Sequence, residues 1–134
     1  MCLKGQIELE KSDGRFEYAK NNFLSCLQNE NLTKDKEKKA YMGLTKCKEI
    51  EGNLNEALAN NRKALNINPY DNNIRESLAL LYVKARELRK AIHQYKLILK
   101  DEKTNPRLYL EVGTLFIFLN QYHNGQRYLE SAKS

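Results

Sequence analysis

A period of 34 residues runs through most of this chain of 134 residues. The segments that align with one another without gaps are 38–71, 72–105 and 106–134. Small residues recur at matching places in them, as at Ala57, Ala91 and Gly125. A period of this length is typical of arrays in which one supersecondary unit stacks on the next copy of itself. It argues against a fold with one unrepeated core.

Each unit has the pattern of two helices joined by a short turn. In segment 38–71, Gly52 and Asn53 interrupt the apolar periodicity, and Asn53 followed by Glu56 resembles a capping box. Small residues at matched positions would let the two helices approach to about 8–10 Å. These positions are Thr45, Ala79 and Gly113 on the first helices and Ala57, Ala91 and Gly125 on the second.

The N-terminal segment matches the unit less well. Residues 14–28 resemble only the second half of the unit, and few residues ahead of Gly14 are apolar, namely Leu3, Ile7 and Leu9. We therefore expect a degenerate repeat over residues 1–34, with an atypical first helix. A linker at residues 29–36 would hold the four residues by which this part departs from the period.

The charge pattern favours a solvated helical surface over a nucleic-acid interface. The formal net charge is +6, but the 23 basic and 17 acidic residues are interspersed along the chain. The local basic run, which consists of Lys34, Lys36, Lys38 and Lys39, is broken by two acidic residues. We interpret it as a solvated linker and helix start.

The three cysteines, Cys2, Cys26 and Cys47, are odd in number and lack CxxC spacing. They offer little support for a disulfide framework or a zinc site. Cys26 and Cys47 lie in apolar-periodic segments, where we expect small buried side chains. Reduced thiols favour a cytoplasmic location, and no apolar stretch approaches the ~18 residues that a membrane span needs.

We find no motif for catalysis or for a cofactor. His93 and His123 fall at outward positions of second helices, and neither has a Cys, Asp or His at ligand spacing. Glycine-rich phosphate loops and the GxSxG elbow are both absent. The sequence therefore predicts no catalytic residue, no metal site, no cofactor and no enzymatic activity.

The chain resembles the tetratricopeptide repeat family. Segment 38–71 carries the family's aromatic, Leu-Gly, Gly, Ala, Ala and Pro positions as Tyr41, Leu44-Thr45, Gly52, Ala57, Ala64 and Pro69. Segment 72–105 departs from the pattern with Arg75 at the aromatic site and Lys103 at the proline site. The resemblance implies an all-α, right-handed α-solenoid of about three to four helix-turn-helix repeats. It implies one array over residues 1–134, and the abrupt ends suggest a fragment of a longer protein.

In this family the first helix of each unit lines a concave groove that binds a peptide or helix of a partner. Carried over to this chain, the partner-binding positions are Lys39, Met42, Lys46, Glu49, Asn73, Glu76, Leu80, Val83, Arg107, Leu110, Thr114 and Ile117. A competing interpretation is that the apolar members of this set pack within the array or lie under a further helix. The family's clamp for chaperone C-termini is not supported, because Glu8, Gly43, Asn73 and Ser77 replace its polar and basic residues.

The resemblance leads us to expect a non-enzymatic adaptor or scaffold that binds a protein or peptide partner. One alternative is an RNA-binding helical-repeat protein, which the net charge favours, but Glu76, Leu80 and Leu110 at groove positions disfavour nucleic acid. A second alternative is a regulatory segment of a larger enzyme or signalling protein. Self-association stays open.

Overall fold

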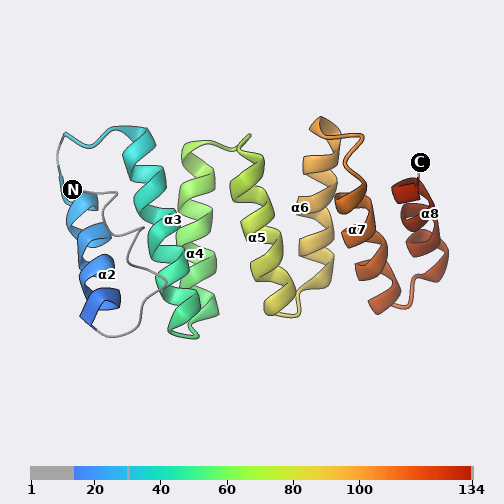
Figure 1. Ribbon diagram of the computed structural model, residues 1–134, viewed down its shortest axis with the longest axis horizontal. Coiled ribbons are helices and arrows are strands. Elements are labelled where there is room, and N and C mark those ends of the chain that lie inside the picture. Colours follow the sequence, from blue (N-terminus) through green and yellow to red (C-terminus); the bar gives the residue numbers. More distant parts are fainter. Residues whose placement is uncertain (1–13, 30, 134) are drawn as a thin grey trace. The chain divides into compact units, whose positions relative to one another are not determined.

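The computed structural model describes residues 14–29 and 31–133, and within them it contains seven helices and no strand (Figure 1). The predicted all-α helical repeat fold is confirmed. The expected first helix, with Leu3, Ile7 and Leu9, lies outside the described residues. The helices are α2 (Gly14–Leu27), α3 (Lys34–Ile50), α4 (Leu54–Ile67), α5 (Asn72–Lys84), α6 (Leu88–Asp101), α7 (Pro106–Phe118) and α8 (Tyr122–Lys133).

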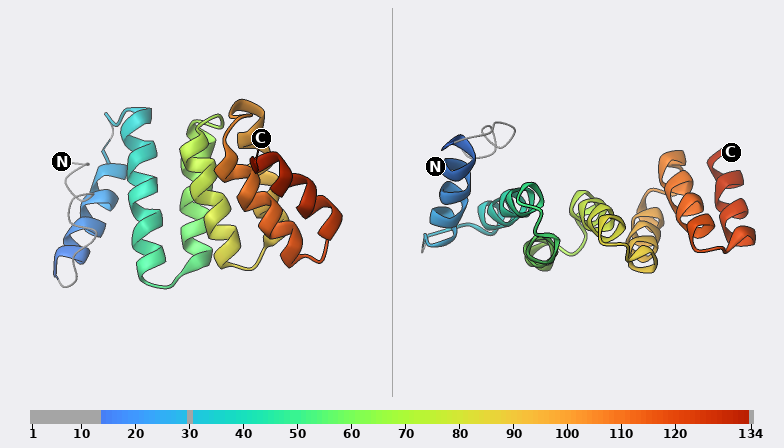
Figure 2. Two further views of the ribbon diagram at one scale, coloured as in Figure 1. Left: turned by 45° about the vertical axis from the view of Figure 1, so that its right-hand side comes forward. Right: turned by 90° about the horizontal axis from the view of Figure 1, so that it is seen from below.

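The chain divides into two compact units between Ile74 and Arg75, in the first turn of α5. In the first unit, α3 packs against both α2 and α4. In the second unit, α7 packs against both α6 and α8, and the helical hairpin of α7 and α8 is seen from two sides in Figure 2. Helices α5 and α7 begin at Asn72 and Pro106, the first residues of two of the aligned segments.

Helix α3 begins earlier than we expected. Its first residue is Lys34, and the Lys36 N–H donates to Oγ1 of the N-cap residue Thr33 at 3.3 Å. The predicted linker over residues 29–36 is therefore too long at its C-terminal end. The basic run forms the first turns of α3, where Asp35 lies 3.3 Å from Lys39. A good N-cap explains this start, because it satisfies a free backbone N–H group.

A left-handed residue recurs at the turn between the helices of each hairpin. The φ angles of Gly52, Arg86 and Asn120 are +81°, +65° and +62°, and these positions are 34 residues apart. In each turn the N–H group of the residue after the left-handed one donates to a carbonyl of the preceding helix. The Asn53 N–H, for example, donates to the Lys48 carbonyl at 2.8 Å. This geometry closes the C-terminus of a helix by the usual left-handed cap.

The expected capping box at α4 is only half formed. The Glu56 N–H donates to the Asn53 side chain at 3.2 Å, so Asn53 caps the helix as predicted. The Asn53 N–H, however, is taken by the Lys48 carbonyl, and the Glu56 carboxylate lies 2.7 Å from Lys48 Nζ. The reciprocal bond of a capping box is replaced by an ion pair to α3.

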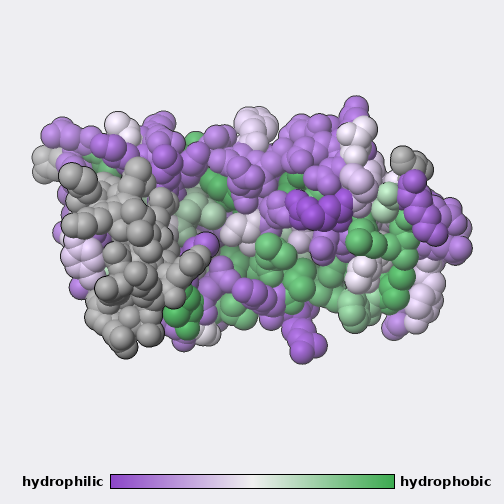
Figure 3. All heavy atoms as spheres, in the orientation of Figure 1, coloured by the Kyte–Doolittle hydropathy of each residue, from purple (hydrophilic) through white to green (hydrophobic). Residues whose placement is uncertain are grey.

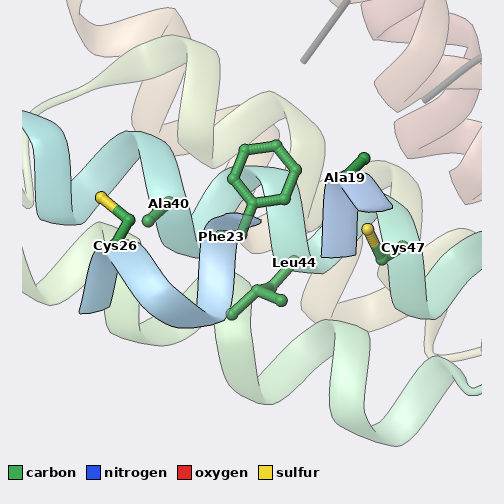
Figure 4. Close-up of a cluster of buried hydrophobic side chains, with 6 residues drawn as sticks. All are labelled: Ala19, Phe23, Cys26, Ala40, Leu44 and Cys47. Atoms are coloured by element: carbon green, nitrogen blue, oxygen red, sulfur yellow. The ribbon is translucent and has the colours of Figure 1, made fainter. Parts of the chain in front are cut away.

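The core of the first unit includes a cluster of small and aromatic side chains from α2 and α3 (Figure 4). Its members are Ala19, Phe23, Cys26, Ala40, Leu44 and Cys47. The Phe23 ring lies directly on Gly43 of α3, where an added Cβ would be 2.3 Å from the nearest ring carbon. The absence of a side chain at Gly43 therefore makes the space for Phe23.

The cysteines differ from the expectation in one respect. Cys26 and Cys47 are buried, as predicted, but Cys26 is disulfide-bonded, which the cysteine count did not predict. Cys47 is a free thiol, and burial raises its pKa to about 11. The argument from reduced thiols to a cytoplasmic location therefore loses its basis.

The core of the second unit includes a close approach of α7 and α8. Gly113 and Gly125 are both buried, and an added Cβ at either glycine would lie 3.0 Å from the other's backbone oxygen. Nearby, the rings of Phe116 and Tyr128 pack with centroids 5.4 Å apart, and Lys96 Nζ lies 5.2 Å from the Phe116 centroid. Gly113 and Gly125, which we predicted to lie at a helix contact, thus lie where α7 and α8 meet.

Candidate functional site

Helix α7 has apolar residues on opposite sides. One side supplies buried core residues, namely Leu108, Val112, Leu115 and Phe116. The other side leaves Leu110, Ile117 and Phe118 exposed, with Leu110 at 52% and Phe118 at 71% of their full accessible surface. Large exposed apolar side chains on one helix face are typical of interaction surfaces.

Local sequence fixes where α7 begins and which way this face points. The Arg107 N–H donates to the side chain of the N-cap Asn105 at 3.1 Å, and Pro106 occupies the first turn. Leu110, Thr114 and Ile117 then follow at helical spacing on one side. The Thr114 hydroxyl donates to the Leu110 carbonyl at 2.8 Å, so this polar residue is satisfied without a ligand.

Helix α5 contributes to the same region of the second unit. Leu80 is 47% exposed, and Glu76, one turn earlier, forms an ion pair with Arg107 that joins α5 to α7. Figure 3 shows hydrophobic residues gathered over α5, α6 and α7. We name the set Glu76, Leu80, Val83, Arg107, Leu110, Thr114, Ile117 and Phe118 the α5–α7 surface.

The charges of the α5–α7 surface and of Glu111 beside it do not balance. The hydrogen bond to Glu76 raises the pKa of Arg107 above its ordinary value, and the charge of Glu111 raises it further. Glu111, one turn along α7, is partly buried and forms no ion pair with any described residue. Burial, with help from Glu111 and Glu76, raises the pKa of Tyr95 to about 12. Two carboxylates therefore share one arginine.

The other predicted groove residues belong to the first unit. Lys46 and Asn73 are exposed, while Lys39, Met42 and Glu49 are partly buried. Lys39 is paired with Asp35 within α3. These positions are more polar than the α5–α7 surface, and their role as partner-binding residues stays a prediction.

Sequence reasoning missed three exposed or partly exposed residues of interest. Ile50 at the end of α3 is 58% exposed and lies 68 residues before Phe118, which is twice the period. Each of the two follows a predicted groove position directly, so the period itself would have found them. Glu111 was missed because its significance depends on the ion pair that engages Arg107.

The first unit has a cleft of about 410 Å³ whose lining includes Lys20, Lys48 and Glu56. Lys20 lies 2.9 Å from Glu51 and Lys48 lies 2.7 Å from Glu56, so these two lysines are paired. Lys63, which also lines the cleft, lies 5.6 Å from the centroid of the Tyr41 ring. The exposed apolar side chains of α7 make the α5–α7 surface the stronger candidate site.

His93 and His123 are exposed, as predicted. Among residues 14–29 and 31–133 there is no group of His, Cys, Asp and Glu side chains that could hold a metal ion. In the same part of the chain, no helix combines the length and hydrophobicity required for crossing a bilayer.

Comparison with known families identifies the class of protein. A family described as Tetratricopeptide repeat matches residues 3–134. The chain therefore belongs to the tetratricopeptide repeat family, and the resemblance seen in the sequence is confirmed. A comparison with curated protein sequences finds no match.

Solved structures share the fold at low sequence identity. A tetratricopeptide repeat protein from Parabacteroides merdae has a TM-score of 0.84 and 21% identity, over 97% of this chain and 50% of that one. For MamA the TM-score is 0.80 with 18% identity, over 98% and 74%. For YrrB, described as a tetratricopeptide repeat protein with an unusual peptide-binding site, it is 0.74 with 16% identity, over 96% and 63%. The chain spans half to three-quarters of these proteins, and the likeness shows the fold.

Proposed function

We propose that this chain is a non-enzymatic adaptor that binds a peptide segment of a partner protein on the α5–α7 surface. The fold is that of a protein-interaction repeat module, which supports the general class. The observation that carries the specific proposal is the exposure of Leu80, Leu110 and Phe118 on one side of helices whose other side is buried. We call these exposed apolar side chains the apolar stripe. An exposed stripe of this kind lowers the solubility of a protein unless another molecule covers it.

The shape and chemistry of the stripe suit a peptide. Leu110 and Ile117 are two helical turns apart, about 10 Å at 1.5 Å per residue. A few apolar side chains of an extended or helical segment can cover that length. YrrB, which has the same fold, is described as having a peptide-binding site, and this supports the class of ligand.

Site-specific photocrosslinking tests this proposal. A benzoylphenylalanine at Thr114, inside the α5–α7 surface, is compared with one at His93, which is exposed on α6. The supporting result is a protein adduct at position 114 that is absent at position 93 and lost when Leu110→Glu is added. Circular dichroism verifies that each variant stays helical.

Two outcomes would contradict the proposal. One is an adduct that nuclease digests and protease does not, and whose yield falls steeply as the salt concentration rises. That result would favour the RNA-binding alternative. Equal adducts at positions 114 and 93, unaffected by Leu110→Glu, would mean that the α5–α7 surface has no special role.

We also propose one array over residues 1–134, in which the groove positions of the first unit bind a partner too, namely Lys39, Met42, Lys46, Glu49 and Asn73. A scaffold is the role that we propose for it. Substituting Lys46→Glu should weaken partner binding less than Leu110→Glu does, because exposed charges contribute little to affinity.

A further inference from the structure

Glu111 differs from the other carboxylates near the α5–α7 surface. It is partly buried, one helical turn from Arg107, and no described residue forms an ion pair with it. Glu76, by contrast, is joined to Arg107. Glu111 also acts on Arg107 through its charge, so two carboxylates face one guanidinium. The region around Arg107 therefore carries an excess negative charge.

The same region would repel an acidic ligand. Glu76 and Glu111 both act on Arg107, so an incoming carboxylate would approach two negative charges and one positive charge. The net repulsion opposes binding. A ligand ammonium or guanidinium group is attracted by the excess negative charge and can form a charge-assisted hydrogen bond to Glu111.

The apolar part of the surface lies close to this charge. Ile117 follows Glu111 by six residues on α7, a rise of about 9 Å. Three residues of extended peptide, or about two turns of a helix, span the same distance. A single short segment can therefore reach Glu111 with one side chain and the apolar stripe with others.

We propose that the partner segment presents a lysine or arginine to Glu111 and apolar side chains to Leu110 and Ile117. This inference rests on the proposed function, because it names the chemistry of the segment that the α5–α7 surface binds. The basic residue would be separated from its apolar anchor by about 9 Å. Specificity would come from the carboxylate and affinity from the apolar contacts.

A phage-displayed library of short random peptides tests the inference directly. The library is panned on the wild-type chain, on Glu111→Gln and on Glu111→Lys, with Gln126→Glu on exposed α8 as the control. Wild type should select peptides with a basic residue at the stated spacing from an apolar one. Glu111→Gln should weaken the selected peptide about tenfold, the size expected for one charge-assisted hydrogen bond.

The outcomes separate this inference from the function on which it rests. Peptides that bind wild type and depend on Leu110, but lack a basic residue or ignore Glu111→Gln, would overturn the inference and leave the peptide-binding function standing. Peptides that ignore Leu110→Glu, or no selected peptide at all, would overturn both. Selection of acidic peptides by Glu111→Lys would add support, because it reverses the charge preference at one position.

Discussion

Gly113 and Gly125 face each other across the α7–α8 hairpin so closely that neither can accept a side chain without movement. A Cβ at Gly113 would also lie 2.8 Å from Leu129, and one at Gly125 would lie 2.8 Å from Ile117. The two other hairpins carry Thr45 with Ala57 and Ala79 with Ala91 at these positions. The last hairpin is therefore the one whose packing depends on having no Cβ atom at either position.

We predict that Gly113→Ala lowers the free energy of unfolding. Overpacking costs about 1–3 kcal/mol, whereas alanine brings roughly 1 kcal/mol to a helix interior. The expected net loss is about 1 kcal/mol, measured by urea unfolding. Gln126→Ala, at an exposed neighbour of Gly125, should change stability by less than about 0.5 kcal/mol. A stabilised Gly113→Ala protein would show that the helices separate freely.

A second prediction concerns Gly43 beneath the Phe23 ring. Gly43→Ala should destabilise the α2–α3 contact by about 1–3 kcal/mol, because three atoms of the buried ring lie within 2.6 Å of the new Cβ. Combining it with Phe23→Leu should recover part of the loss, since leucine vacates the space the ring fills. A double-mutant cycle measures this coupling, expected at about 0.5–3 kcal/mol. Strict additivity of the two changes would contradict the packing described above.

A third prediction uses the left-handed turn residues. Arg86 has a φ of +65° at the position where the first hairpin has Gly52. A residue with a Cβ loses roughly 1–2 kcal/mol in this conformation, so Arg86→Gly should raise the melting temperature. Gly52→Ala should lower it for the same reason. Arg89→Gly, at an exposed position in the first turn of α6, is the matched control, and it should destabilise by at most roughly 1 kcal/mol because glycine weakens a helix.

The helices and their small contact residues could be predicted from sequence because both depend on local features. Helical periodicity and the recurrence of Ala57, Ala91 and Gly125 are visible without any knowledge of neighbours. The left-handed turn at Arg86 could be predicted only from its place in the period, because arginine itself gives no sign of a positive φ. The period was the more informative signal.

The features that sequence could not supply arise from contacts between distant residues. The Glu76–Arg107 ion pair joins residues 31 positions apart, and it leaves two carboxylates, Glu76 and Glu111, near one guanidinium. The Cys26 disulfide likewise depends on proximity in space, whereas the odd cysteine count suggested none. The sequence therefore predicts which helix faces form the candidate site, but it does not predict which charged side chains pair there.

A last prediction follows from the Asp71 carboxylate, which caps α5 and pairs with α3. One oxygen accepts the N–H groups of Asn73 and Ile74 at 3.0 and 3.3 Å, and the other lies 3.1 Å from Lys38 Nζ. Burial raises the pKa of Asp71, but the hydrogen bonds from Lys38 and from the two N–H groups outweigh it and leave the pKa below 3.8. A lowered pKa in the folded state means that the ionised carboxylate stabilises the fold.

The Asp71 contribution should be present at neutral pH and disappear in acid. Because the pKa is lower in the folded chain, the stability is complete above the ordinary aspartate value of 3.8 and is lost as pH falls through the folded-state value. Asp71→Asn keeps a capping oxygen but no charge, so wild type should exceed it in urea unfolding at pH 7 and equal it in strong acid. Asp101→Asn, at a carboxylate 57% exposed, should differ less from wild type at pH 7. A gap between wild type and Asp71→Asn that does not change with pH would contradict the ion pair with Lys38.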